Sequence, residues 1–161
     1  METSTPASSV NAVLSTVLRP EILRIAALVL GVLAVLFLGL ITAGTHAGAQ
    51  EARSSVGMGW GQANVVAAAM FGVVTRVWIL STLTCAAGVV LAFVRRLPAA
   101  GACFLGSAFG AHWLLGGFLR ASEGGGLLWL LLPVYLAGAA ACGAYYLSLH
   151  PYVATVAEPE V

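Results

Sequence analysis

Four long apolar stretches constrain the fold of this sequence more than any other feature. The first, over residues 25–43, contains 19 uncharged residues. As a helix it would be about 28 Å long, close to the roughly 30 Å thickness of the hydrocarbon core of a bilayer. Because backbone polar groups inside lipid must be paired within the protein, we expect helices in all four stretches. The sequence therefore predicts an all-α fold: a polytopic membrane protein with four transmembrane helices in an antiparallel bundle.

The composition supports this class of protein. Hydrophobic residues make up 60% of the 161 residues and charged residues only 8%, whereas soluble domains are about 45–50% apolar. The formal net charge is +1, and the sequence has neither a basic patch nor an acidic tail. We predict that the lipid bilayer surrounds the chain and that nucleic acid is not a partner.

The positions of charged and polar residues set the boundaries of the transmembrane domain, 25–149. We predict spans at about 25–43, 76–94, 99–119 and 127–149. An outer loop is expected over 44–75, because residues 44–64 form the most polar internal segment. Within this loop, residues 65–75 either extend the second span or lie on the membrane surface; both options stay open.

The two ends of the chain are expected outside the bilayer. In the N-terminal segment, 1–24, apolar residues from Val10 to Leu18 recur at i, i+3, i+4, i+7 and i+8. This spacing is typical of a helix lying on the membrane, and a disordered tail is the alternative. A short C-terminal tail covers 150–161.

Arg76 is the only charged side chain in residues 65–94. The pair Arg95–Arg96 fixes one end of the second span, because two guanidinium groups enter hydrocarbon only at high cost. Arg76 precedes this pair by 19 residues, about 28 Å along a helix, which places it at the opposite membrane surface. The alternative is a buried Arg76 that pairs with Glu51 or Glu123 in a conduction path.

Arginine counts predict the orientation of the chain. With the N-terminus in the cytoplasm, four arginines lie near the inner surface and three near the outer one: Arg19, Arg24, Arg95 and Arg96 inside, and Arg53, Arg76 and Arg120 outside. All of these except Arg53 are interpreted as topology anchors. Since cytoplasmic segments carry the excess of positive charge, we expect both termini in the cytoplasm, by a margin of one charge.

Small residues predict the faces on which helices pack. Ala102, Gly106 and Gly110 recur every four residues on the third span, and such residues let two helix backbones approach closely. We assign the same role to Gly138 and Cys142 on the fourth span. Whether the face on the third span packs within the chain or against a second molecule stays open.

Two prolines bear on the helices. Pro98 follows the Arg95–Arg96 pair, and a proline is well tolerated in the first turn of a helix, where its missing N–H costs nothing. This link is so short that the second and third spans must form a tight antiparallel hairpin. Pro133 lies inside the predicted fourth span, where it would remove a backbone hydrogen bond, so we expect a kink there.

The sequence offers few groups for chemistry. His112 on the third span has no partner histidine at its depth, because His46 lies in the predicted loop and His150 at the far end of the fourth span. We expect His112 to make a polar contact between helices inside the membrane. The three cysteines lie in different apolar runs without CxxC spacing, and no paired carboxylates or nucleophile–base set are evident. We predict no catalytic residue, no metal site and no cofactor.

Two stretches resemble a known family. Leu18–Arg24 is an arginine-flanked segment that leads into the first span, and Ser107–Leu119 is an aromatic third span. Together with the four spans, the short tails and the tight link between spans two and three, they resemble MARVEL-type membrane proteins, especially the relatives of synaptogyrin and synaptophysin. The chain lacks the cysteine pair that some of these relatives have in the first loop, and it lacks a tyrosine-rich tail. The resemblance implies a role in vesicle membranes, trafficking and membrane apposition rather than catalysis.

Three functions are compatible with these features. The first is a non-enzymatic integral membrane protein that organises membranes or associates laterally, either with other membrane proteins or as a homo-oligomer. The alternative is an accessory subunit of a larger membrane complex, with the small-residue faces as docking surfaces. A small transporter comes third, since it would require ionisable groups at mid-depth and only His112 and Arg76 are candidates.

Overall fold

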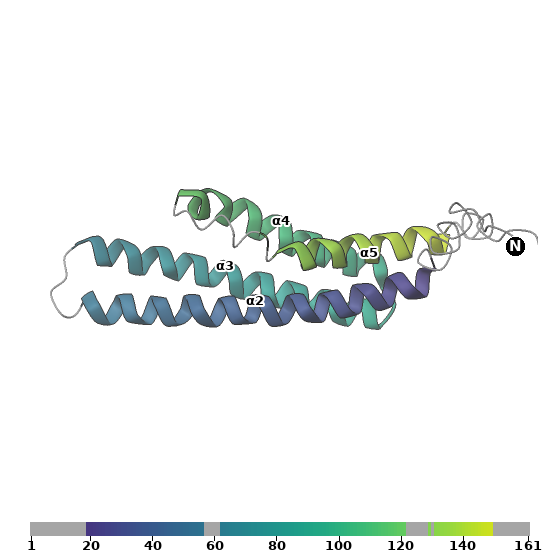
Figure 1. The fold of residues 1–161 in the computed structure, drawn as a ribbon, viewed down its shortest axis with the longest axis horizontal. Helices are drawn as coiled ribbons and strands as arrows, with labels where there is room; N and C mark the ends of the chain where they lie inside the picture. The colour runs from purple at the N-terminus through teal and green to yellow at the C-terminus, as the bar shows by residue number, and fades with distance from the viewer. Residues whose placement is uncertain (1–18, 57–61, 122–128, 130, 150–161) are drawn as a thin grey trace, which may run out of the picture.

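The computed structural model describes residues 19–56, 62–121, 129 and 131–149. In these residues four α-helices are each long and apolar enough to cross a membrane: α2 (Pro20–Val56), α3 (Gln62–Phe93), α4 (Leu97–Ala121) and α5 (Leu132–Leu149). Helix α2 packs mainly on α3 and α5, and α4 packs mainly on the same two helices (Figure 1). The predicted all-α, multi-pass membrane bundle is confirmed. The predicted interfacial helix before Leu18 and the tail from residue 150 lie outside the described residues.

The loop predicted over 44–75 is wrong for most of its length. Helix α2 continues to Val56, and α3 already begins at Gln62, so residues 65–75 extend the second span as a helix. Polar side chains in α2 are satisfied locally, as the Ser54 hydroxyl shows by donating to the Glu51 carbonyl at 2.8 Å. A helix pairs its backbone groups whatever the polarity of its side chains, so a polar segment does not have to end it.

Contacts between α2 and α3 explain why both helices continue through this region. A Cβ placed on Gly48 would lie 3.6 Å from the Phe71 ring, and one placed on Gly72 would lie 3.9 Å from Nη2 of Arg53. Each glycine thus admits a side chain from the other helix. The α2–α3 hairpin therefore stays paired and extends past α4 and α5 at one end (Figure 1).

A tight turn joins α3 to α4, as the short link predicts. Arg95 has a positive φ of 63°, and the Arg96 N–H donates to the Leu91 carbonyl at 2.8 Å while the Arg95 N–H donates to Ala92 at 3.2 Å. These two bonds form a Schellman motif, which satisfies carbonyls that the end of a helix leaves unpaired. Glycine is usual at this position, because it has no Cβ penalty at positive φ. In this chain an arginine occupies it.

The helices on either side of the 122–128 segment begin and end differently from the prediction. Helix α4 extends two residues beyond each end of the predicted span, 99–119. Helix α5 begins at Leu132, and residues 127, 128 and 130 of the predicted fourth span lie outside the described residues. Pro133 is consequently the second residue of α5, in its first turn, where no backbone hydrogen bond is lost. Pro133 is therefore not interior to α5, which removes the reason for the expected kink.

The core lies between the four helices, and all of them contribute buried residues to it. Phe104 of α4 is fully buried, and its ring fills a notch between two glycines of the neighbouring helices. A Cβ on Gly31 would lie 2.8 Å from Cζ of Phe104, and one on Gly88 would lie 2.9 Å from Cε1. Trp78, also fully buried, has an indole N–H without a hydrogen-bond partner in the described structure. The bundle is thus held chiefly by close apolar packing, as expected when lipid removes the hydrophobic driving force between helices.

Candidate functional site

Helices α4 and α5 pack through small residues on facing sides. A Cβ on Gly138 would lie 2.7 Å from Cδ2 of Leu105, so the leucine side chain occupies the space that this glycine leaves. A Cβ on Gly101 would lie 2.6 Å from Sγ of Cys142. Gly138 and Cys142 therefore lie against α4 as helix-packing residues, with Gly101 as a partner that the four-residue pattern did not include.

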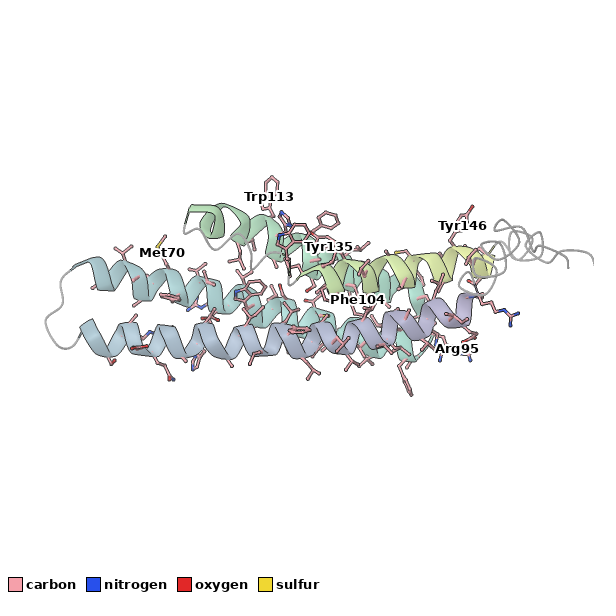
Figure 2. All side chains as sticks on the ribbon, viewed as in Figure 1. Met70, Arg95, Phe104, Trp113, Tyr135 and Tyr146 are labelled. Carbon is pink, nitrogen blue, oxygen red and sulfur yellow. The ribbon has the colours of Figure 1, made fainter. Side chains whose placement is uncertain are left out.

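The other predicted packing residues lie on the opposite side of α4. Ala102 and Gly106 are exposed, and a Cβ on Gly106 or Gly110 would have no neighbour within 4 Å. The intramolecular option for this pattern is thus not realised in the described part of the chain. Phe109 and Trp113, which are 61% and 86% exposed, lie on the same side, and Figure 2 shows Trp113 pointing away from the bundle. We call Ala102, Gly106, Phe109, Gly110 and Trp113 the outer face of α4.

Hydrogen bonds between hydroxyl-bearing residues link the helices inside the bundle. The Ser107 hydroxyl donates to the Ser81 carbonyl at 2.8 Å, and the Ser81 hydroxyl donates to the Ser107 carbonyl at 3.5 Å. Thr42 and Thr82 lie with their hydroxyl oxygens 3.3 Å apart across α2 and α3. Such bonds are worth about 0.6–2 kcal/mol each in membranes. Sequence reasoning missed them because the sequence does not show which side of a span faces a neighbouring helix.

His112 makes its contact with α5. Its Nδ1 lies 3.4 Å from the hydroxyl of Tyr135, and the Tyr135 ring packs edge-on against Phe109 with centroids 5.3 Å apart. Together with Trp113 these residues line a shallow hollow of about 250 Å³. The histidine therefore bridges two helices within an aromatic cluster.

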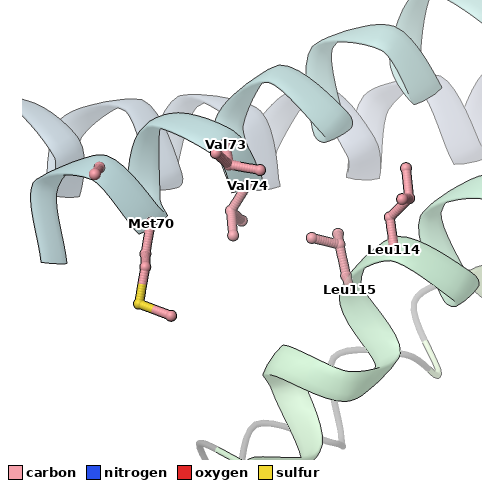
Figure 3. A pocket seen from close by; sticks show the side chains of 6 residues that line it. Met70, Val73, Val74, Leu114 and Leu115 are labelled. Carbon is pink, nitrogen blue, oxygen red and sulfur yellow. The ribbon is translucent and has the colours of Figure 1, made fainter. Parts of the chain in front are cut away.

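An apolar hollow of about 270 Å³ lies between α3 and α4. Figure 3 shows Met70, Val73 and Val74 on α3 facing Leu114 and Leu115 on α4. Its side chains are apolar, so it offers no group for chemistry.

Most of the predicted anchors gather near one end of the bundle. Glu21 pairs with Arg24 at 3.1 Å and with Arg95 at 3.8 Å, while Arg19 and Arg96 are exposed. Exposed ion pairs of this kind contribute little stability, about 0–1 kcal/mol, so they mark a polar surface rather than hold the fold. The side chain of Arg120 lies outside the described residues.

Arg76 lies far from these anchors along α3 and is exposed. It lines a cavity with His46 and Arg53 of α2, residues that the sequence analysis placed in a loop. Among the described residues it forms no ion pair with Glu51; Glu123, its other predicted partner, is not described. A pattern of polar residues every three or four positions in 46–53 was the signal for this helical face.

No group of three histidine, cysteine, aspartate or glutamate side chains in the described part of the chain could hold a metal ion. The sequence matches no family model, no curated protein and no solved structure. The resemblance to MARVEL-type proteins therefore rests on the two stretches quoted above. Gly31, Gly88 and Gly138 pack against side chains of neighbouring helices, whereas the glycines on the outer face of α4 do not.

Proposed function

We propose that this chain is a non-enzymatic membrane protein that associates laterally in the bilayer through the outer face of α4. The observation that carries the proposal is that a Cβ placed on Gly106 or Gly110 would meet nothing within 4 Å. On another side of α4, Gly101 is closely packed by Cys142 of α5. A second helix could approach this face as closely as α5 approaches Gly101.

Physical arguments favour packing of the outer face of α4 against a second helix over exposure of this face to lipid. In a bilayer, helices associate through van der Waals packing, and glycines at four-residue spacing allow the closest backbone approach. Phe109 and Trp113 lie on the same face, and large rings add contact area beside a glycine groove. The first partner to test is a second copy of this chain.

The other proposed roles use the same surface or follow from the sequence. An accessory subunit of a larger complex would present this face to a different protein. The resemblance to MARVEL-type proteins favours a role in organising vesicle membranes, and the arginine counts favour cytoplasmic termini. The transporter reading has little support, because His112 bonds to Tyr135 and Arg76 lies near a predicted membrane surface.

The test measures self-association in lipid vesicles by energy transfer between labelled copies. We expect the Gly106→Leu variant to lose association, because leucine would fill the groove that a second helix needs. Gly39→Leu on α2 is the matched control, since Gly39 also has no neighbour within 4 Å but lies away from α4. Equal association of the wild type and the Gly106→Leu variant would exclude a homo-oligomer through this face.

A second experiment tests for association with a different membrane protein. Mild solubilisation of native membranes should recover another membrane protein with the wild type and not with the Gly106→Leu variant. The proposed function is contradicted if the protein stays monomeric in vesicles and no partner is recovered from native membranes.

A further inference from the structure

A polar cavity of about 170 Å³ lies between α2 and α3, away from the outer face of α4. Its walls come from one side of each helix: His46, Ala49, Gln50 and Arg53 from α2, and Gly72, Thr75, Arg76 and Ile79 from α3. The small side chains of Ala49 and Gly72 leave room between the two helices. Three basic side chains thus face one space whose centre is not filled by protein.

The charges around this cavity are not balanced by the protein in the part of the chain that the structure describes. The acidic residues described are Glu21, near the opposite end of α2, and Glu51, which does not line the cavity. Neither Arg53 nor Arg76 forms an ion pair there. Two guanidinium groups facing one cavity repel each other, and a bound anion removes that cost.

The donors that remain free suit an oxyanion. The Thr75 hydroxyl already donates to the Phe71 carbonyl at 2.7 Å, and Gln50 and His46 bond to each other at 3.1 Å. Among the described residues, the guanidinium groups of Arg53 and Arg76 form no ion pair. Arginine presents these groups as a planar fork that matches the oxygens of a phosphate or carboxylate.

Distances along the helices place this cavity at a membrane surface. Arg24 and His46 are separated by 21 uncharged residues on α2, so the two residues lie about 33 Å apart along a helix, and Arg76 and Arg95 are about 28 Å apart on α3. Both values match a hydrocarbon thickness of about 30 Å. With Arg24 and Arg95 at one surface, the cavity lies at the other, at the depth of lipid phosphate groups.

We propose that this cavity binds a phosphate group through Arg53 and Arg76. The group comes either from an anionic phospholipid or from free inorganic phosphate. A zwitterionic lipid fits less well, because its ammonium group would meet the same positive charges. The site uses α2 and α3 and does not depend on the proposed association through α4.

Two measurements separate the sources of the phosphate. Native mass spectrometry of the full chain in mixed micelles counts bound phosphatidylglycerol against phosphatidylcholine. Thermal unfolding in detergent without added lipid compares sodium phosphate with sodium chloride at equal ionic strength. Retained phosphatidylglycerol supports a lipid site, and stabilisation by inorganic phosphate alone supports a soluble ligand.

Variants test whether the cavity is responsible. We expect Arg76→Gln and Arg53→Gln each to weaken binding on the order of tenfold, since each removes charge-assisted hydrogen bonds. Gly72→Leu keeps every charge and fills the cavity, so it should weaken binding as well. If Arg76→Gln does not insert, Arg53→Gln and Gly72→Leu still decide the question.

Arg96→Gln is the matched control, because Arg96 is exposed near the opposite surface. It should leave binding unchanged. Equal weakening by Arg96→Gln would mean general attraction of anionic lipid to arginine, and it would overturn the proposal. Absence of preference for phosphatidylglycerol together with no effect of inorganic phosphate would overturn it too.

Discussion

Phe104 and Gly106 are two residues apart on α4, yet they lie in opposite environments. Phe104 is 0% exposed and its ring contacts the glycines of two other helices, whereas Gly106 is exposed and meets nothing within 4 Å. The inner glycines, Gly31 and Gly88, receive a side chain from within the chain. The outer glycines of α4 are free to receive one from another molecule. The same residue type therefore serves folding on one side of the bundle and, as proposed, association on the other.

The largest effect is expected for Phe104→Ala. Loss of a fully buried ring leaves a cavity that rigid helices cannot close, and we expect about 3 kcal/mol lower free energy of unfolding. The measurement is unfolding by dodecyl sulfate in mixed micelles. Phe109→Ala on the exposed side is the control and should cost much less, and equal losses for the two variants would remove the distinction between the two sides of α4.

The second-largest loss of unfolding free energy is expected for Gly31→Ala. The added Cβ would approach Cζ of Phe104 and, at 2.9 Å, Cγ2 of Val89. Because the ring is buried and cannot move away, overpacking should cost about 1–3 kcal/mol. Gly39→Ala on the same helix has open space and should not destabilise in the same assay. A Gly31→Ala protein as stable as the wild type would show that the notch is looser than described.

Ser107→Ala is expected to have a moderate effect. It removes the 2.8 Å hydrogen bond to the Ser81 carbonyl, worth about 0.6–2 kcal/mol between membrane helices. The control is Thr84→Val, because the Thr84 hydroxyl donates only to Leu80 of its own helix. A similar change in unfolding free energy for both variants would mean that the bond between α3 and α4 contributes nothing beyond a local one.

The smallest effect on unfolding is expected for Gly106→Ala. Its Cβ would meet nothing, and alanine favours a helix by up to about 1 kcal/mol over glycine. The monomer should be as stable as the wild type or slightly more stable when unfolding is measured with the protein highly diluted in detergent. Marked destabilisation of the monomer would place Gly106 inside the bundle and contradict the comparison between the two faces.

Much of the architecture could be predicted from the sequence, because uncharged runs long enough to cross a bilayer have few other solutions. The failures have specific causes. Residues 44–56 contain histidine, glutamine, glutamate and arginine, and polarity alone suggested a loop, but a helix satisfies its own backbone and α3 supplies the packing partner. Leu127 belongs to the same apolar run as Leu132, so hydrophobicity could not show where α5 begins. The cavity at Arg76 required His46 and Arg53 to be helical.

By itself, the sequence determined that the chain spans a membrane several times, since charges are costly in lipid and its apolar runs carry few of them. It also determined where small residues recur. Only the tertiary structure decided which of these residues face inward. Successive residues on a helix differ by about 100° in direction, so Gly101 packs on Cys142 while Ala102 points outward. A one-residue difference in register separates a packing face from an open one, and only contacts between distant segments set that register.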